Sequence, residues 1–292
     1  MKKIGFIGLG NMGKGMSMNL GAKGHDVLGF DINEEMFKKL KNSNVKRASS
    51  IEHLTNEADI IITMLPDGKA VKKVWKEIFK YSKNKQYLID CSTIDVKTSL
   101  ETQNEAKEKK LLTLDAPVSG GVIGADNGTL TFMVGGDINV YKEMEFLFNI
   151  MGKNSILCGE IGAGQSAKIC NNMLLATTMI AVGESFELGK NLGLNLNKLY
   201  DVLSTSSGSC WAINTYCPVK GVGPKSPSDQ DYKGGFSTDL MFKDLGLAIQ
   251  AIKETQTKGD YTNNTYKKFE TMVRNGKGKL DFSSVINENK KL

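Results

Sequence analysis

The sequence predicts an α/β protein in which a doubly wound parallel sheet precedes an all-helical domain. A short apolar run at the N-terminus ends in a glycine-rich turn, and similar runs then alternate with helix-length stretches. The strand pattern ceases near residue 162, where a long helical pattern begins. At 292 residues the chain is long enough for two domains. We therefore expect one domain over 1–161 and a helical domain over 162–292.

The glycine-rich turn follows a strand expected over 3–8 and precedes a helical pattern. It reads Gly8-Leu9-Gly10-Asn11-Met12-Gly13, which is the spacing G-x-G-x-x-G. Gly8 permits the tight turn, Gly10 lets the backbone approach a pyrophosphate, and Gly13 lets the helix pack on the strand. The N–H groups at the start of that helix would face the phosphates. These features predict a dinucleotide site in a Rossmann-type domain.

An acidic residue ends the second expected strand. That strand covers 26–30 and ends in Asp31, which lies 18 residues after Gly13, near the place expected for a carboxylate that accepts from a ribose 2′-hydroxyl. A negative charge there repels a 2′-phosphate, and the following Ile32-Asn33 supplies no arginine. We therefore predict NAD rather than NADP. The alternative is an ordinary strand–turn–helix with a helix-capping aspartate.

The remaining elements follow from apolar periodicity. The run 60–65 is apolar on both faces, as a central strand covered by helices on both sides should be. Strands are expected over 59–64, 86–91, 112–116, 130–135 and 155–158, with helices over 70–80 and 97–109. A single helix about 45 Å long is expected over 164–193, followed by helices over 197–203, 239–255, 263–274 and 282–289. Four aromatic residues in the Ser-, Gly- and Pro-rich segment 204–237 predict an ordered excursion there.

Composition excludes several classes of protein. The 38 basic and 32 acidic residues are mixed along the chain without an arginine-rich block, so no nucleic-acid partner is expected. Five scattered cysteines and two histidines make a metal site improbable. No apolar run approaches the ~20 residues of a membrane span. Because the glycine motif starts so near the N-terminus, we expect a cytoplasmic protein, or a mitochondrial one if a transit peptide has been removed.

A lysine and an asparagine lie one turn apart at the start of the expected long helix. Lys168 and Asn172 share a face in a stretch of small and apolar residues. Lysine is rarely buried without a partner. Lys168 is therefore a candidate to exchange a proton with a substrate hydroxyl, with Asn172 orienting the substrate. A solvated lysine at the entrance of a helix is the alternative.

Two further segments carry polar groups. The turn Ser119-Gly120-Gly121 follows a predicted strand, at the sheet edge where doubly wound folds bind ligands. Its hydroxyl and backbone N–H groups suit a carboxylate. A flexible turn without a ligand would have the same sequence and is the alternative interpretation. Lys243 and Asp244 interrupt an apolar pattern, and a structural ion pair is the competing interpretation there.

Together these segments resemble the β-hydroxyacid dehydrogenase family. The motifs G-L-G-x-M-G, D-A-P-V-S-G-G, G-x-G-x-x-x-K-x-x-N-N and K-D-L-x-L-A occur in order at 8–13, 115–121, 162–172 and 243–248. Further likeness, including the loop at Trp211, points to the branch that oxidises 3-hydroxyisobutyrate to methylmalonate semialdehyde with NAD in valine catabolism. Two departures are Cys217, where this branch carries asparagine, and Ala70, where an amide that reaches the cofactor is usual.

The resemblance implies a role for each motif. Lys168 would be the catalytic acid and base, and its pKa would be lowered by burial and by the oxidised nicotinamide. The substrate, a small hydroxy acid, would contact Ser119, Gly120, Gly121, Asn172, Trp211 and Asp244. The cofactor NAD would contact Gly8, Leu9, Gly10, Asn11, Met12, Gly13, Asp31, Leu65, Pro66, Thr93 and Lys243. A homodimer or homotetramer is also implied, with the long helix in the interface.

Other functions remain open at this point. A semialdehyde reductase acting on tartronate or succinate semialdehyde would share the fold, but Asp31 and the Trp211 loop argue against it. Decarboxylation of a phosphorylated sugar acid would need a basic phosphate site that the sequence does not offer. A non-catalytic cofactor-binding module would usually lose the lysine, and Lys168 is present.

Overall fold

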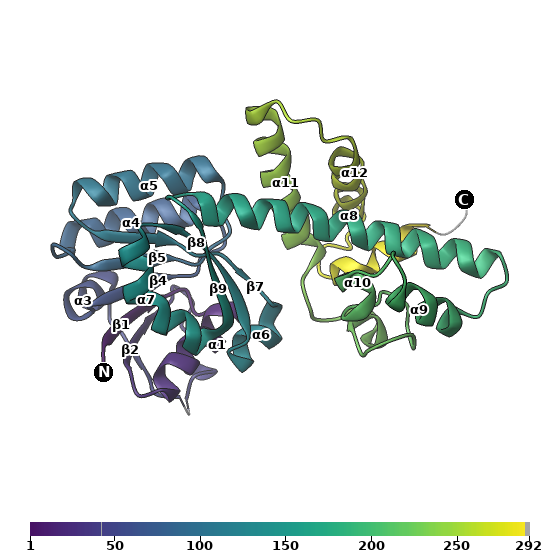
Figure 1. Cartoon of the computed structure of the whole chain (residues 1–292). Coiled ribbons are helices and arrows are strands. Elements are labelled where there is room, and N and C mark those ends of the chain that lie inside the picture. The colour runs from purple at the N-terminus through teal and green to yellow at the C-terminus, as the bar shows by residue number, and fades with distance from the viewer. Residues whose placement is uncertain (42, 290–292) are drawn as a thin grey trace. The chain divides into compact units, whose positions relative to one another are not determined.

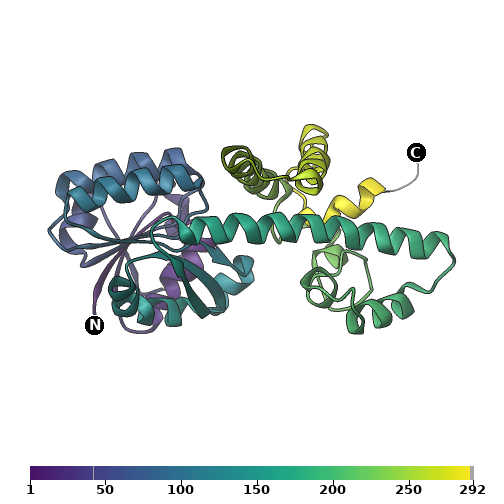
Figure 2. The same ribbon diagram turned by 45° about the horizontal axis from the view of Figure 1, so that its top comes forward.

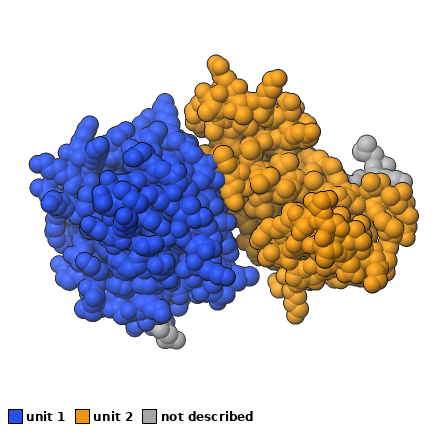
Figure 3. All heavy atoms as spheres, viewed as in Figure 1, with its two compact units in different colours: residues 1–168 blue, residues 169–292 orange. Residues whose placement is uncertain are grey.

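The computed structural model of the protein describes residues 1–41 and 43–289, which form two compact units. The chain divides after Lys168, so that unit 1 begins at Met1 and unit 2 begins at Ile169 (Figure 3). The division falls inside helix α8 (Ala163–Asn191), a few residues beyond the expected boundary at 161. Within the described ranges, no helix is both long enough and apolar enough to cross a membrane.

Unit 1 is a twisted sheet with helices on both faces (Figure 1). Its strands are β1 (Lys3–Ile7), β2 (Asp26–Phe30), β3 (Val45–Arg47), β4 (Ile60–Thr63), β5 (Tyr87–Asp90), β6 (Leu112–Asp115), β7 (Val118–Ser119), β8 (Leu130–Gly136) and β9 (Gly152–Gly159). Its helices before α8 are α1 (Asn11–Ala22), α2 (Glu35–Lys38), α3 (Ile51–Glu57), α4 (Gly68–Tyr81), α5 (Val96–Glu108), α6 (Gly121–Asn127) and α7 (Ile138–Met151).

The strand order confirms a doubly wound sheet and corrects one detail. The order is β3-β2-β1-β4-β5-β6-β8-β7, with β9 paired to β8, and strands β1 to β6 run parallel. Strand β8 instead runs antiparallel to β6 and β7. Apolar periodicity identifies a strand but does not encode its direction. The sequence also missed β3 and β7, which are too short for an alternating pattern to be recognised.

Strand β4 shows why the sheet is covered on both sides. Ile60 and Ile62 pack into one apolar cluster with Phe6 of β1, whereas Ile61 packs into another with Trp75 of α4. Because successive side chains of a strand point to opposite faces, each face needs its own layer of helices. Figure 2 shows helices on either side of the sheet. The interpretation of this run as a central strand is confirmed for 60–63, whereas Met64 and Leu65 follow the end of β4.

Unit 2 is helical and has its own apolar core. Besides its part of α8 it contains α9 (Leu196–Thr205), α10 (Trp211–Asn214), α11 (Thr238–Thr255), α12 (Asp260–Arg274) and the 3₁₀ helices η1 (Pro227–Gln230) and η2 (Phe282–Asn289). Phe186, Met241 and Phe269 are among the residues buried in this core. The excursion over 204–237 is ordered, as expected, and contains α10 and η1. An isolated β-bridge joins Ser237 to Asp281.

Two buried carboxyl groups end neighbouring strands of unit 1. Asp90 of β5 and Asp115 of β6 are register partners, and both are almost fully buried. Oδ1 of Asp90 accepts hydrogen bonds from the hydroxyls of Thr63 (2.8 Å) and Ser92 (2.6 Å). Its Oδ2 has no hydrogen-bond partner among the described residues. Loss of hydration on burial raises the pKa of Asp90 to about 6, although the bonds from Ser92 and Thr63 oppose this rise.

We predict that Asp90→Asn weakens the pH dependence of folding stability. The folded chain keeps a proton on Asp90 up to a pKa of about 6, whereas the unfolded chain releases it near the ordinary value of 3.8. This contribution to stability is fully present below the unfolded pKa and is lost as the pH rises through the folded one. The loss amounts to about 3 kcal/mol. Urea unfolding at pH 4 and pH 7 should show most of that loss in the wild type relative to the variant. Parallel changes in both proteins would contradict it.

Candidate active site

The three glycines of the motif differ in what requires them. Gly8 has a φ of +95°, and a Cβ there would lie 2.2 Å from the carbonyl oxygen of Met64. A Cβ on Gly13 would lie 1.9 Å from the carbonyl oxygen of Gly8. At Gly10, in contrast, a Cβ would meet no protein atom within 4 Å. The fold thus requires Gly8 and Gly13, whereas Gly10 leaves open space that a pyrophosphate can enter, so the residues fit a dinucleotide.

The start of α1 also suits an anion. Gly10 is the N-cap, no side chain of the described chain caps this helix, and its first turn holds no acidic residue. Helices α4, α5 and α7 of the same unit are capped by Asp67, Asp95 and Asp137. The first N–H groups of a helix need an acceptor. At α1 they fall at Asn11, Met12 and Gly13, the residues expected to hold the phosphates.

Asp31 is tied to the glycine turn. Its Oδ2 accepts the backbone N–H of Leu9 at 2.7 Å, and its Oδ1 accepts that of Asn33 at 2.8 Å. An ionised carboxylate has about four acceptor positions, so Asp31 retains capacity for ribose hydroxyls. The neighbouring Ile32 is exposed and uncharged. The remaining acceptor positions of this carboxylate suit the hydroxyl groups of a ribose.

The segments expected on the nicotinamide side follow the next two strands. Leu65 and Pro66 follow β4, and Thr93 follows β5, while β1, β4, β5 and β6 are adjacent and parallel. The carboxyl ends of these strands therefore meet at one edge of the sheet. The backbone N–H of Leu65 donates to Oγ of Ser92 at 2.8 Å, which joins the two segments directly.

The turn after β7 has the backbone that its glycines predict. Gly120 and Gly121 have φ values of +136° and +62°, which favour glycine. A Cβ on Gly121 would meet nothing within 4 Å. Ser119 is partly exposed beside this open backbone. The turn is therefore accessible to a small anion.

Helix α8 begins against a buried carboxylate that the sequence reasoning did not assign. Asp115 accepts the backbone N–H of Gly162 (2.7 Å) and of Gln165 (2.9 Å), and also the side-chain amide of Gln103 (3.0 Å). Three residues beyond Gln165, Lys168 is only 7% exposed. The sequence did contain a sign of this role. Asp115 ends an apolar strand, and a charged residue among apolar neighbours is expected to be buried with hydrogen-bond partners.

Three of the predicted residues in unit 2 lie together. Nδ2 of Asn172 donates to Oδ2 of Asp244 at 2.6 Å, and Nζ of Lys243 lies 3.1 Å from Oδ1 of Asp244. Asn172 and Asp244 are nearly fully buried. The ion pair that competed with a functional interpretation is therefore present, and its carboxylate also fixes the orientation of the Asn172 amide.

Trp211 and Cys217 have different environments in unit 2. Trp211 is 47% exposed and stacks on Tyr216, with 4.8 Å between ring centroids. The hydroxyl of Tyr216 donates to Asp281 at 2.8 Å, which fixes the ring that supports the indole. Cys217 is fully buried in the core of unit 2. The change to cysteine there places a thiol in an apolar environment.

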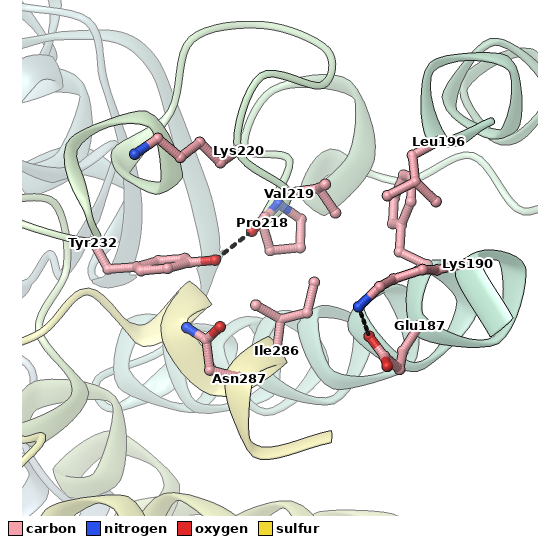
Figure 4. Close-up of a pocket in the computed structure, with 10 residues that line it drawn as sticks. Glu187, Lys190, Leu196, Pro218, Val219, Lys220, Tyr232, Ile286 and Asn287 are labelled. Atoms are coloured by element: carbon pink, nitrogen blue, oxygen red, sulfur yellow. Dashed lines mark hydrogen bonds and ion pairs between the residues drawn. The ribbon is translucent and has the colours of Figure 1, made fainter. Parts of the chain in front are cut away.

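A cavity of about 240 Å³ in unit 2 lies among other residues (Figure 4). The hydroxyl of Tyr232 donates to the carbonyl of Pro218 at 2.9 Å on one side, and Lys190 pairs with Glu187 at 3.8 Å on the other. None of the predicted site residues lines this cavity. Its shape therefore does not locate the chemistry.

Comparisons with known proteins identify the family. Residues 3–159 match the model of the NAD-binding domain of 6-phosphogluconate dehydrogenase, and residues 162–288 match the NAD-binding domain of NADP-dependent 3-hydroxyisobutyrate dehydrogenase. The chain is 44% identical to the mitochondrial 3-hydroxyisobutyrate dehydrogenase of Rattus norvegicus over 97% of its own length and 85% of the relative's. The chain belongs to the 3-hydroxyisobutyrate dehydrogenase family.

Relatives from Mycobacterium tuberculosis agree with this assignment. A probable 3-hydroxyisobutyrate dehydrogenase of that organism is 43% identical over 98% of this chain and 97% of its own. A solved structure of a 3-hydroxyisobutyrate dehydrogenase from M. tuberculosis with L-serine is 41% identical, with a TM-score of 0.95 over the whole of both chains. The family resemblance seen in the sequence is thus confirmed, and the protein is a nicotinamide-dependent oxidoreductase.

We predict that alanine at Gly10 will affect cofactor binding, whereas alanine at Gly13 will affect folding stability. Gly10→Ala leaves the fold intact, because the added methyl group meets open space, but it lowers NADH affinity by about tenfold or more by obstructing the phosphates. Gly13→Ala lowers the free energy of unfolding by about 1–3 kcal/mol, because its methyl group meets the backbone of Gly8. Urea unfolding and NADH fluorescence titration would measure both. Unchanged NADH affinity in Gly10→Ala would refute the assignment of that space.

Proposed function

We propose that the protein oxidises 3-hydroxyisobutyrate to methylmalonate semialdehyde with NAD⁺, and that Lys168 is the general acid and base. The observation that carries this proposal is the burial of Lys168 on α8, one helical turn before Asn172. At 7% exposure, Lys168 is largely shielded from bulk water, as a group that exchanges a proton with a substrate rather than with solvent should be. The names of the relatives supply the substrate.

The reaction separates a hydride from a proton. NAD⁺ supplies the hydride acceptor at C4 of its nicotinamide ring. The carbinol carbon of the substrate loses the hydride, the hydroxyl oxygen loses its proton to neutral Nζ of Lys168, and the carbonyl double bond forms. In the reverse direction the ammonium of Lys168 returns the proton to the aldehyde oxygen. A positioned acid–base group of this kind contributes about 10²- to 10⁴-fold to the rate.

The charge of Lys168 sets the pH dependence of the reaction. Oxidation requires the amine form at the start of each turnover, so its rate should increase with pH until the lysine is fully deprotonated. Reduction requires the ammonium form and should show the opposite trend. A substrate with a single carboxylate disfavours the amine less than a phosphorylated substrate would. A small monoacid is therefore the better fit.

The other predicted residues would position the substrate and the cofactor. We assign the carboxylate of the substrate to the turn Ser119-Gly120-Gly121, whose backbone is open. The amide of Asn172, held by Asp244, would orient the substrate hydroxyl toward Lys168. Trp211 would contact the rest of the substrate, and Lys243 would contact the cofactor.

We assign NAD rather than NADP to the ribose site. The carboxylate of Asp31 is already fixed by the backbone of Leu9 and Asn33, so it cannot turn away from the ribose without breaking two hydrogen bonds. A 2′-phosphate would meet this negative charge with no compensating cation at Ile32. The preference for NAD follows from this repulsion.

We predict that Lys168→Ala lowers turnover with 3-hydroxyisobutyrate by about 10²- to 10⁴-fold, because the alcohol proton loses its acceptor. NADH affinity should change little, since the phosphate and ribose contacts are unaltered. Initial rates of NADH formation and fluorescence titration would measure the two quantities. Lys267→Ala, at an exposed lysine of α12, is the control and should retain wild-type turnover. Turnover in Lys168→Ala equal to that of the control would remove Lys168 from the chemistry.

We also propose a homodimer or homotetramer that pairs through unit 2. Large apolar side chains, each more than half exposed, recur along α8, the connection that follows it and α9: Leu174, Leu188, Leu192, Leu194 and Val202. Sedimentation velocity should give a mass of two or four chains. Lysine at Leu188 and Leu192 should shift that mass toward one chain, whereas Ile156→Lys, at an exposed residue of β9, should not. A monomeric wild type would contradict the proposal.

A further inference from the structure

A buried glutamine joins the start of α8 to the loop expected beside the nicotinamide. Gln165 is fully buried. Its Oε1 accepts the backbone N–H of Ile94 at 3.0 Å, and its Nε2 donates to the backbone carbonyl of Ser92 at 2.7 Å. The side-chain amide therefore spans the residues on either side of Thr93. All of these groups belong to unit 1.

The same loop is fixed from its other side. Oγ of Ser92 accepts the N–H of Leu65 at 2.8 Å and donates to Oδ1 of Asp90 at 2.6 Å. The loop is thus hydrogen-bonded to the segment after β4, to the end of β5 and to α8. Segments of unit 1 that are distant in the sequence therefore meet at this short loop. Each of them carries or adjoins a residue expected to contact the nicotinamide or the reacting hydroxyl.

We propose that Gln165 is a positioning residue that sets the location of Lys168 relative to the loop of Thr93. This inference rests on the proposed function, in which Lys168 receives the alcohol proton. Lys168 lies three residues after Gln165 in the same helix, so a movement of this turn also moves Nζ. Displacement of a catalytic group by about 1 Å can cost about 10²-fold in rate. The side-chain amide of Gln165 restrains such displacement by donating one hydrogen bond to Ser92 and accepting one from Ile94.

Glutamine is well suited to this position because both ends of its amide are used. A carboxylate could accept from Ile94 but could not donate to Ser92, and a methionine could do neither. The backbone N–H of Gln165 is held separately by Asp115. Substitution of the side chain therefore leaves that anchor of the helix in place. The effect of the loop contact can thus be tested apart from the start of the helix.

Gln86 provides a matched control at the other end of β5. It is 5% exposed, and its Nε2 donates to the backbone carbonyls of Thr55 (2.8 Å) and Ala58 (2.7 Å). Its Oε1 accepts the N–H of Lys83 at 3.1 Å. Gln86 is thus a second buried glutamine of unit 1 that bridges backbone groups. It differs from Gln165 in lying at the amino end of the sheet.

The test compares Gln165→Met with Gln86→Met. Both variants lose buried hydrogen bonds, so both should show a lower melting temperature. In Gln165→Met alone, kcat should fall about 10- to 100-fold. The isotope effect with substrate deuterated at the carbinol carbon should rise in that variant, while its affinity for NADH stays within about threefold of wild type. Hydrogen–deuterium exchange of the peptide that contains Ile94 should accelerate in Gln165→Met and not in Gln86→Met.

The outcomes are distinguishable from failure of the proposed function. Wild-type kcat and isotope effect in folded Gln165→Met would overturn the positioning role, as would unchanged exchange at Ile94. If Gln165→Met does not fold, Gln165→Leu, which also lacks both hydrogen-bonding groups, takes its place and should show the same loss of kcat. If the wild type itself fails to oxidise 3-hydroxyisobutyrate, the proposed function fails. The same comparison on a hydroxy acid that it does oxidise then decides the role of Gln165.

Discussion

The structure of unit 1 depends on the carboxylate of Asp115. A long helix needs acceptors for its first N–H groups, and negative charge is favourable at that end. Asp115 supplies both from inside the sheet, accepting from Gly162 and Gln165, and Gln103 offsets the cost of burying its charge. The start of α8 is therefore fixed to the end of β6. The position of Lys168 follows from that attachment.

The neighbouring carboxyl, Asp90, is about as buried as Asp115 but accepts its hydrogen bonds differently. Asp115 accepts hydrogen bonds at both oxygens, whereas Asp90 accepts at Oδ1 alone. The raised pKa of Asp90 reflects its burial first, with Asp115 adding a minor repulsion. Its hydroxyl partners nevertheless connect β4 to the loop after β5. The carboxyl ends of these strands thus share a polar network beneath the loops that are expected to contact the cofactor.

The sequence predicted those features that depend on local patterns. Glycine spacing located the dinucleotide turn, and the two-sided apolar run at 60–65 located a central strand. The antiparallel direction of β8 left no such pattern. The bond between Asn172 and Asp244, 72 residues apart, and the contacts of Gln165 with the loop of Thr93 exist only once the chain has folded. Asp115 lies in a motif of the sequence, but its partners Gly162 and Gln165 are distant along the chain, so sequence reasoning did not find its supporting role.

We propose that a buried lysine and an acidic ribose site make this chain an NAD-dependent dehydrogenase of a small 3-hydroxy acid. Initial rates of reduced cofactor formation test it most directly. The substrates are 3-hydroxyisobutyrate, 3-hydroxypropionate, L-serine and D-glycerate, each with NAD⁺ and with NADP⁺. We expect the highest kcat/KM for 3-hydroxyisobutyrate with NAD⁺, with smaller values for the analogues, since one methyl group is worth only about 1–3 kcal/mol. Activity confined to D-glycerate with NADP⁺ would contradict both specificity assignments.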